Sequence, residues 1–217
     1  MKTNSLGIYI HVPYCLRKCI YCGFFSCAHV PDENEQNTYA ASIERELEKA
    51  TEEFGIRRVD TVFFGGGTPT VLKAAILSRL LAAVKRAFDV AADAEITTES
   101  NPGTLTERDL TVLREAGFNR LSIGCQSFDD TVLKALGRIH TAEEALEAYR
   151  AARRCGFGNI NLDLMFAVPG HTPEIWEDTL YRVTDLKPEH ISAYSLQMEE
   201  DTLCQRSEER RVGKECR

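Results

Sequence analysis

The sequence predicts an α/β fold built around a parallel sheet, and three observations support this prediction. Between residues 7 and 194, six short apolar segments alternate with longer segments whose apolar side chains recur at helical spacing. No two neighbouring apolar segments are joined by a hairpin turn, so each connection has to cross over through a helix. The 217 residues are 43% hydrophobic and 27% charged, which is the composition of an ordinary globular protein with a core of its own.

We expect six strands, each rich in apolar and β-branched residues. They cover residues 7–13, 58–64, 94–100, 119–124, 158–165 and 189–194. A complete eight-stranded α/β barrel needs about 250 residues. The six units therefore predict a partial (β/α)6 barrel of the TIM type, truncated at the C-terminus, with residues 1–205 as one domain.

The helices between these strands carry clear start and stop signals. Thr106 and Thr141 each stand three residues before an acidic residue, the spacing of a capping box, and Thr172 precedes a proline that suits the first turn. Gly55 and Gly117 follow the last apolar residue of their helical segments, as C-terminal glycines do. These signals support the helical assignment independently of the apolar spacing.

Three cysteines follow the first strand at the spacing C-x3-C-x2-C. They are Cys15, Cys19 and Cys22. Three thiolates can hold three corners of a cubane [4Fe–4S] cluster and leave the fourth iron open to a small molecule. A zinc site that adds His11 or His29 is the alternative, although zinc sites favour paired C-x2-C motifs.

Polar residues and glycines stand where the second to fifth strands end, and ligands of parallel βα folds gather at that edge. The second strand ends in Gly66, Gly67 and Thr68, where glycine lets the backbone approach a ligand closely. The third strand ends near Glu99, and a buried carboxylate is costly unless it is paired or bound to a ligand. The next two strands bring Ser122, Gln126 and Asp163 to the same edge.

Seven further segments, together with the cysteine motif, resemble one family over residues 6–203. They are Tyr-Ile-His-Val-Pro-Tyr-Cys, Phe-Phe-Gly-Gly-Gly-Thr-Pro, Glu-Ser-Asn-Pro-Gly-Thr, Leu-Ser-Ile-Gly-Cys-Gln-Ser-Phe, Leu-Gly-Arg-Ile-His, Asn-Ile-Asn-Leu-Asp-Leu-Met and Pro-Glu-His-Ile-Ser-Ala-Tyr-Ser-Leu. This set resembles radical S-adenosylmethionine (SAM) enzymes, and within them the oxygen-independent coproporphyrinogen III oxidase group. In that family SAM chelates the fourth iron and is cleaved by one electron from the cluster, and the resemblance implies that this chain binds the same cluster and SAM.

The resemblance also implies roles for the polar residues. Gly66, Gly67 and Thr68 match a motif that cradles the methionine amino group of SAM, and Glu99 matches a residue that contacts SAM.

Arg138 and Asp163 match positions that bind polar groups near a second ligand, and Gln126 belongs to the same candidate set. Tyr9 and Tyr21 flank the cysteine motif and are expected to pack on SAM or the cluster. Each polar residue could instead be satisfied locally at a cap or turn.

The group contains true oxidases, heme chaperones and heme-opening methyltransferases. Phe24 stands where the oxidases have a fourth cysteine, and no extension precedes the first strand, so the chain resembles the heme-chaperone branch most. The Cys-Gly-Phe-Phe segment of residues 22–25 resembles the heme-opening branch. The resemblance implies binding of heme and its transfer to an acceptor protein, with a reductant such as flavodoxin. It leaves open whether the chain acts as an enzyme that cleaves SAM.

The net charge of −7 argues against a nucleic-acid partner. No apolar run of 18 residues predicts a transmembrane segment, and no signal peptide precedes the first strand, so we expect a cytoplasmic location.

The last twelve residues, 206–217, are charged and lack an apolar period. They resemble a translated sequencing adapter, so we expect them to be an artefactual tail that takes no part in the fold. The heme-related C-terminal region of the chaperone branch, with its His-Asn-x-x-Tyr-Trp motif, is missing from the sequence.

Overall fold

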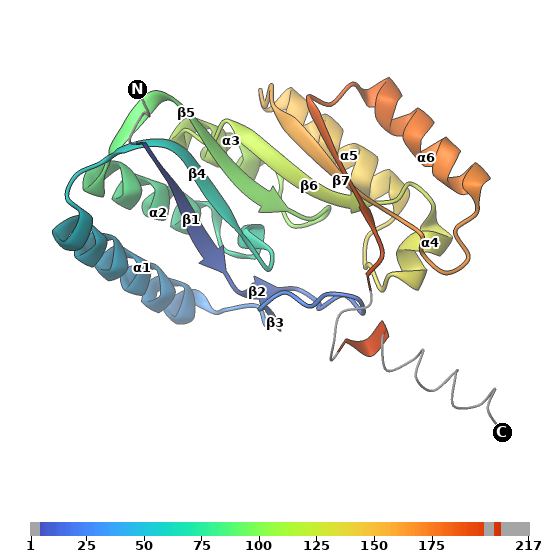
Figure 1. Ribbon diagram of the computed structural model, residues 1–217, viewed down its shortest axis with the longest axis horizontal. Helices are drawn as coiled ribbons and strands as arrows, with labels where there is room; N and C mark the ends of the chain where they lie inside the picture. The colour runs from blue at the N-terminus through green and yellow to red at the C-terminus, as the bar shows by residue number, and fades with distance from the viewer. Residues whose placement is uncertain (1–4, 198–201, 205–217) are drawn as a thin grey trace.

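The computed structural model describes residues 5–197 and 202–204, and its centre is a six-stranded parallel sheet (Figure 1). The strands lie in chain order, each beside the one before it. They are β1 (Leu6–Val12), β4 (Arg58–Gly66), β5 (Asp89–Ser100), β6 (Arg120–Gln126), β7 (Ile160–Phe166) and β8 (His190–Ser195). This arrangement confirms the predicted partial (β/α)6 barrel.

The helices form an outer layer in which α1 packs on α2, α2 on α3 and α3 on α5. They are α1 (Glu33–Phe54), α2 (Ala74–Ala87), α3 (Glu107–Ala116), α4 (Asp130–Ala135), α5 (Ala142–Arg154) and α6 (Pro173–Leu186), with a short 3-10 helix η1 (Pro69–Val71). The capping boxes at Thr106 and Thr141 are present, and Gly117 ends α3 in the left-handed conformation.

The two faces of the sheet have different surroundings, as β4 illustrates. Phe64 is fully buried against the helices, where its ring lies 5.1 Å from that of Phe118. Its neighbour Phe63 points to the opposite face and lines a cavity on the inner side. The hydrophobic core therefore lies between the sheet and the helices, and the inner face is left for polar groups.

Two features differ from the sequence-based expectation. β5 begins at Asp89 and not at residue 94, because its first residues pair with Arg58 and Val59 although they are mostly alanine and aspartate. A small parallel sheet of β2 (Tyr14–Cys15) and β3 (Cys27–Ala28) was not predicted. Two-residue strands depend on tertiary contacts and leave no periodic signal in the sequence.

The segment between β1 and α1, residues 13–32, carries the three cysteines and is called the cysteine loop below. The end of β1 and the start of the cysteine loop dock on the glycine loop, residues 65–68, through two backbone hydrogen bonds. The N–H of Gly67 donates to the carbonyl of Val12, and the N–H of Thr68 donates to that of Tyr14, both at 2.7 Å. A Cβ on Gly67 would lie 2.6 Å from the Tyr14 carbonyl oxygen, so only glycine allows this approach.

In the part of the chain that the structure describes, no helix combines the length and apolarity that a membrane crossing requires. The predicted tail, residues 206–217, lies outside the described residues.

We expect Gly67→Ala to lower the free energy of unfolding by about 1–3 kcal/mol, because the new methyl group meets backbone atoms that cannot move alone. Gly158→Ala is the matched control. Its Cβ would meet nothing within 4 Å, so its effect should stay within about 0.5 kcal/mol. Urea unfolding of the reduced protein measures both. Equal midpoints for the two variants would show that the close approach at Gly67 is no constraint.

Candidate functional site

A cavity of about 820 Å³ opens on the inner face of the sheet, toward the carboxyl ends of the strands. Tyr21, Cys22, Glu99, Gln126 and Asp163, all predicted site residues, line it. The cysteine loop, β5, β6 and β7 thus bring their polar groups to one space, as the fold class predicts. The cavity holds enough volume for a ligand of cofactor size.

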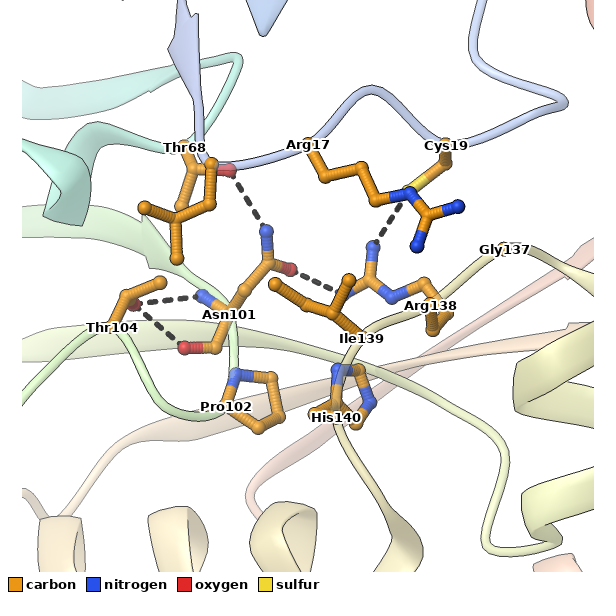
Figure 2. Close-up of a pocket in the computed structure, with 11 residues that line it drawn as sticks. Arg17, Cys19, Thr68, Asn101, Pro102, Thr104, Gly137, Arg138, Ile139 and His140 are labelled. Atoms are coloured by element: carbon orange, nitrogen blue, oxygen red, sulfur yellow. Dashed lines mark hydrogen bonds between the residues drawn. The ribbon is translucent and has the colours of Figure 1, made fainter. Parts of the chain in front are cut away.

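A second, smaller pocket lies beside the same loop (Figure 2). Cys19, Thr68, Asn101 and Arg138 line it. The predicted residues therefore divide between two spaces, with Cys22 facing the large cavity and Cys19 the small pocket. Arg138, which was expected near the same second ligand as Asp163, does not line the large cavity and contacts the cysteine loop at Cys19.

The three thiols of the cysteine loop interact with each other and with two donors. The Thr68 hydroxyl lies 3.6 Å from the sulfur of the buried Cys15, and the Arg138 guanidinium donates to the Cys19 sulfur at 3.3 Å. Burial raises the pKa of the Cys22 thiol, and the neighbouring Cys19 and Cys15 raise it further. Three sulfurs on one loop, two of which face a hydrogen-bond donor, are a ligand set suited to an iron–sulfur cluster.

Both histidines of the zinc alternative have other partners. His11 Nε2 donates to the Phe25 carbonyl oxygen at 2.8 Å, and His29 contacts the Glu35 carboxylate at 2.9 Å. Across residues 5–197 and 202–204, no three His, Cys, Asp or Glu side chains are arranged to hold a single metal ion.

Glu99 lies between the glycine loop and the cavity. Its carboxylate accepts a hydrogen bond of 3.1 Å from the N–H of Gly66. Burial raises the pKa of this carboxyl to about 7, an effect that the Gly66 N–H partly offsets and that nearby Asp163 strengthens. Near neutral pH, the Glu99 carboxyl can therefore either accept or donate a proton.

Asp163 is held in a network on the neighbouring strands. Ser122 donates to its carboxylate at 3.1 Å, and the Asn161 amide donates to it at 2.7 Å. Ser192 of β8 donates in turn to the Asn161 side chain at 3.0 Å. Burial nevertheless raises the pKa of Asp163. The network fixes a polar wall of the cavity.

Gln126 ends β6 with a φ of 67°, in the left-handed region that residues other than glycine seldom occupy. This backbone conformation accompanies a side chain that lines the cavity and is almost fully buried. Strained backbone of this kind is concentrated at functional sites.

The two predicted tyrosines have different surroundings. Tyr21 lines the cavity, and burial and nearby Cys19 raise the pKa of its hydroxyl. Tyr9 donates to His11 Nδ1 at 3.0 Å, because the other ring nitrogen of His11 already donates to Phe25. The ring of Tyr9 is 57% exposed and does not line the cavity.

Sequence reasoning missed Asn101, Arg120, Asn161 and Ser192, all of which line one of the two spaces. Asn161 could have been found, because it stands two residues before Asp163 on the same strand and so shares its face. Arg120 begins β6, and no local pattern indicates that it reaches the cavity.

Comparison with known proteins agrees with this geometry. A sequence profile described as the radical SAM superfamily matches residues 9–182. The chain therefore belongs to the radical SAM superfamily. Within it, the chain is similar to the heme chaperone HemW of Escherichia coli, with 40% identity over 203 residues that cover 94% of this chain and 53% of that protein.

Two further relatives extend the comparison. The mitochondrial radical S-adenosyl methionine domain-containing protein 1 of Bos taurus is 36% identical, covering 92% of this chain and 45% of that protein. The solved structure of coproporphyrinogen III oxidase (HemN) from Escherichia coli superimposes with a TM-score of 0.81 at 34% identity, covering 89% of this chain and 44% of that one. The chain spans about half the length of the curated relatives it matches.

Glu99→Gln should make stability less dependent on pH. The pKa of Glu99 is higher in the folded than in the unfolded state, so its ionisation destabilises the folded chain. This destabilisation is absent below pH 4.5 and grows as the pH rises to about 7. At pH 8 the free energy of unfolding of the variant should be higher than that of the unsubstituted chain by up to about 3 kcal/mol, and this difference should shrink toward pH 4.5. Urea unfolding across this range measures it. Glu52→Gln, at an exposed position on α1, is the control. A difference between Glu99→Gln and the natural chain that does not change with pH would contradict the raised pKa.

Proposed function

We propose that this chain is the radical SAM core of a HemW-like heme chaperone, which binds a [4Fe–4S] cluster, SAM and heme and transfers heme to an acceptor protein. The observation that carries the proposal is the position of Cys22. It places the cysteine loop at the edge of the cavity that Glu99, Gln126 and Asp163 line. A cofactor on that loop would face polar groups from three strands.

Cys15, Cys19 and Cys22 would hold the cluster. Three ligands on one loop suit a cluster with one open iron. When bound, the cluster supplies that iron for the amino and carboxylate groups of SAM and one electron from a reductant such as flavodoxin. The chain's own contribution is to present donors from Thr68 and Arg138 to two of the sulfurs.

The cavity suits SAM in charge and polarity. SAM carries a cationic sulfonium and an ammonium group, and Glu99 and Asp163 supply two carboxylates. A cation beside Glu99 favours the ionised carboxylate over the protonated one and so offsets the cost of burial. Gln126 and Ser122 offer neutral hydrogen-bond partners for hydroxyl groups, and the ring of Phe63 offers an apolar surface.

The heme part of the proposal rests on similarity to HemW, and we assign no residue to heme. A cytoplasmic location belongs to the same proposal. Because this chain covers 53% of the E. coli HemW sequence, the activity of the whole protein is inferred from the relative.

The second candidate is an oxygen-independent coproporphyrinogen III oxidase, favoured by the close superposition on HemN. Phe24 distinguishes the chaperone candidate from the oxidase candidate, because the oxidases carry a cysteine at this position. In this structure Phe24 lies beside Cys22 in the cavity lining, with 72% of its surface exposed. An anaerobic heme-opening activity is the third possibility, on the Cys-Gly-Phe-Phe segment.

Anaerobic reconstitution with iron and sulfide should load about four irons per chain. Alanine at Cys15, Cys19 or Cys22 should abolish loading, whereas Cys155→Ala, at the end of α5 beside Glu107, should leave it intact. Addition of SAM should change the EPR spectrum of the reduced cluster. Protein that holds one zinc and no iron, or a spectrum indifferent to SAM, would rule out the cluster assignment.

The chaperone and oxidase candidates differ in their products. Incubated anaerobically with SAM, reductant and coproporphyrinogen III, a chaperone should leave the porphyrinogen unchanged, while heme added separately should bind and move to an acceptor. Formation of protoporphyrinogen IX, detected by chromatography, would establish the oxidase instead.

A further inference from the structure

Asn101 follows β5 and lies between two donors of the small pocket (Figure 2). Its Oδ1 accepts a hydrogen bond from Arg138 Nη2, and its Nδ2 donates to Thr68 Oγ1 at 2.8 Å. Arginine has only donors, so the amide oxygen has to face Arg138 and the amide N–H has to face Thr68. The single hydroxyl proton of Thr68 is then free to point at the sulfur of Cys15.

Arg138 reaches the other sulfur. Its Nη1 donates to Cys19 at 3.3 Å, and its Nη2 also donates to the carbonyl of Gly124 at 2.7 Å. No carboxylate among the described residues forms an ion pair with this guanidinium. A largely buried cation needs a compensating anion, and the thiolate sulfurs of the cysteine loop stand where that anion is required.

The surroundings of Asn101 keep this arrangement rigid. Its backbone carbonyl accepts hydrogen bonds from both the hydroxyl and the N–H of Thr104, at 2.6 and 3.1 Å. Gly124 leaves the space into which the two side chains reach. A Cβ there would lie 2.5 Å from Asn101 Oδ1 and 3.2 Å from Arg138 Nη2.

We propose that Asn101 is a positioning residue that holds the Thr68 hydroxyl and the Arg138 guanidinium against Cys15 and Cys19, and thereby raises the reduction potential of the cluster. The proposal rests on the proposed function, in which these cysteines bind the cluster. Hydrogen bonds and positive charge at the sulfurs stabilise the reduced cluster, which is the more negative of its two states. Asn101 acts through its two neighbours and touches neither the sulfurs nor a substrate.

The test compares Asn101→Ala with Asn119→Ala. Asn119 is also a half-buried asparagine, but it contacts the middle of β5, where it accepts from the N–H of Ile96 and donates to the carbonyl of Ala94. Both variants are reconstituted anaerobically, their iron is counted, and the midpoint potential is measured by an EPR-monitored redox titration. In Asn101→Ala, the ratio of reduced to oxidised cluster at the natural midpoint should fall about tenfold, a shift of ~59 mV for one electron.

Asn119→Ala should keep the natural midpoint. Gly124→Ala should shift the midpoint in the same direction as Asn101→Ala, because its methyl group displaces the same two side chains, and it serves as the test if Asn101→Ala does not fold. An unchanged midpoint in a variant that retains its iron would overturn the role of Asn101 and leave the cluster assignment standing. A natural chain that takes up no iron would overturn both.

Discussion

Two backbone hydrogen bonds that join the glycine loop to the end of β1 and the start of the cysteine loop are the constraint on which the site depends. The N–H groups of Gly67 and Thr68 bind the carbonyls of Val12 and Tyr14. They tie the end of β4 to the start of the cysteine loop, and this contact brings the Thr68 hydroxyl to Cys15. The amides of the glycine run are hydrogen-bonded within the chain, that of Gly66 to the Glu99 carboxylate and that of Gly67 to the Val12 carbonyl.

The alternation of side chains along the strands separates the apolar core from the polar cavity. Alternate residues of each strand face the helices or the cavity, so apolar packing and polar chemistry share the same seven to twelve residues. Phe64 belongs to the core, while Phe63 and Glu99 face the cavity. The raised pKa of Glu99 follows from this geometry, because its face of the sheet is shielded from water although it is polar.

Sequence reasoning predicted the parallel sheet of six strands, the capped helices and the residues that end the strands, because each leaves a local pattern. It placed Glu99 and Asp163 at the same edge of the sheet from topology alone, and the structure shows that both line one cavity there. It could not predict that Arg138 contacts Cys19, since 119 residues separate them and no local pattern encodes the contact. The role of Asn101 could not be predicted either, because a turn asparagine and an asparagine that bridges two side chains look alike in one sequence.

The long separations around the cysteine loop set an order for assembly. The ribosome synthesises the cysteine loop first, yet Thr68 and Arg138, which donate to its sulfurs, and Asn101, which contacts both of them, come much later in the chain. Closing such long segments is slow compared with forming a helix, so the donors reach the sulfurs only after most of the sheet has formed. Until Arg138 has been synthesised and packed, the thiols stand in a loop without its full set of donors. Iron that arrives during synthesis therefore meets a site different from the one it meets in the folded chain.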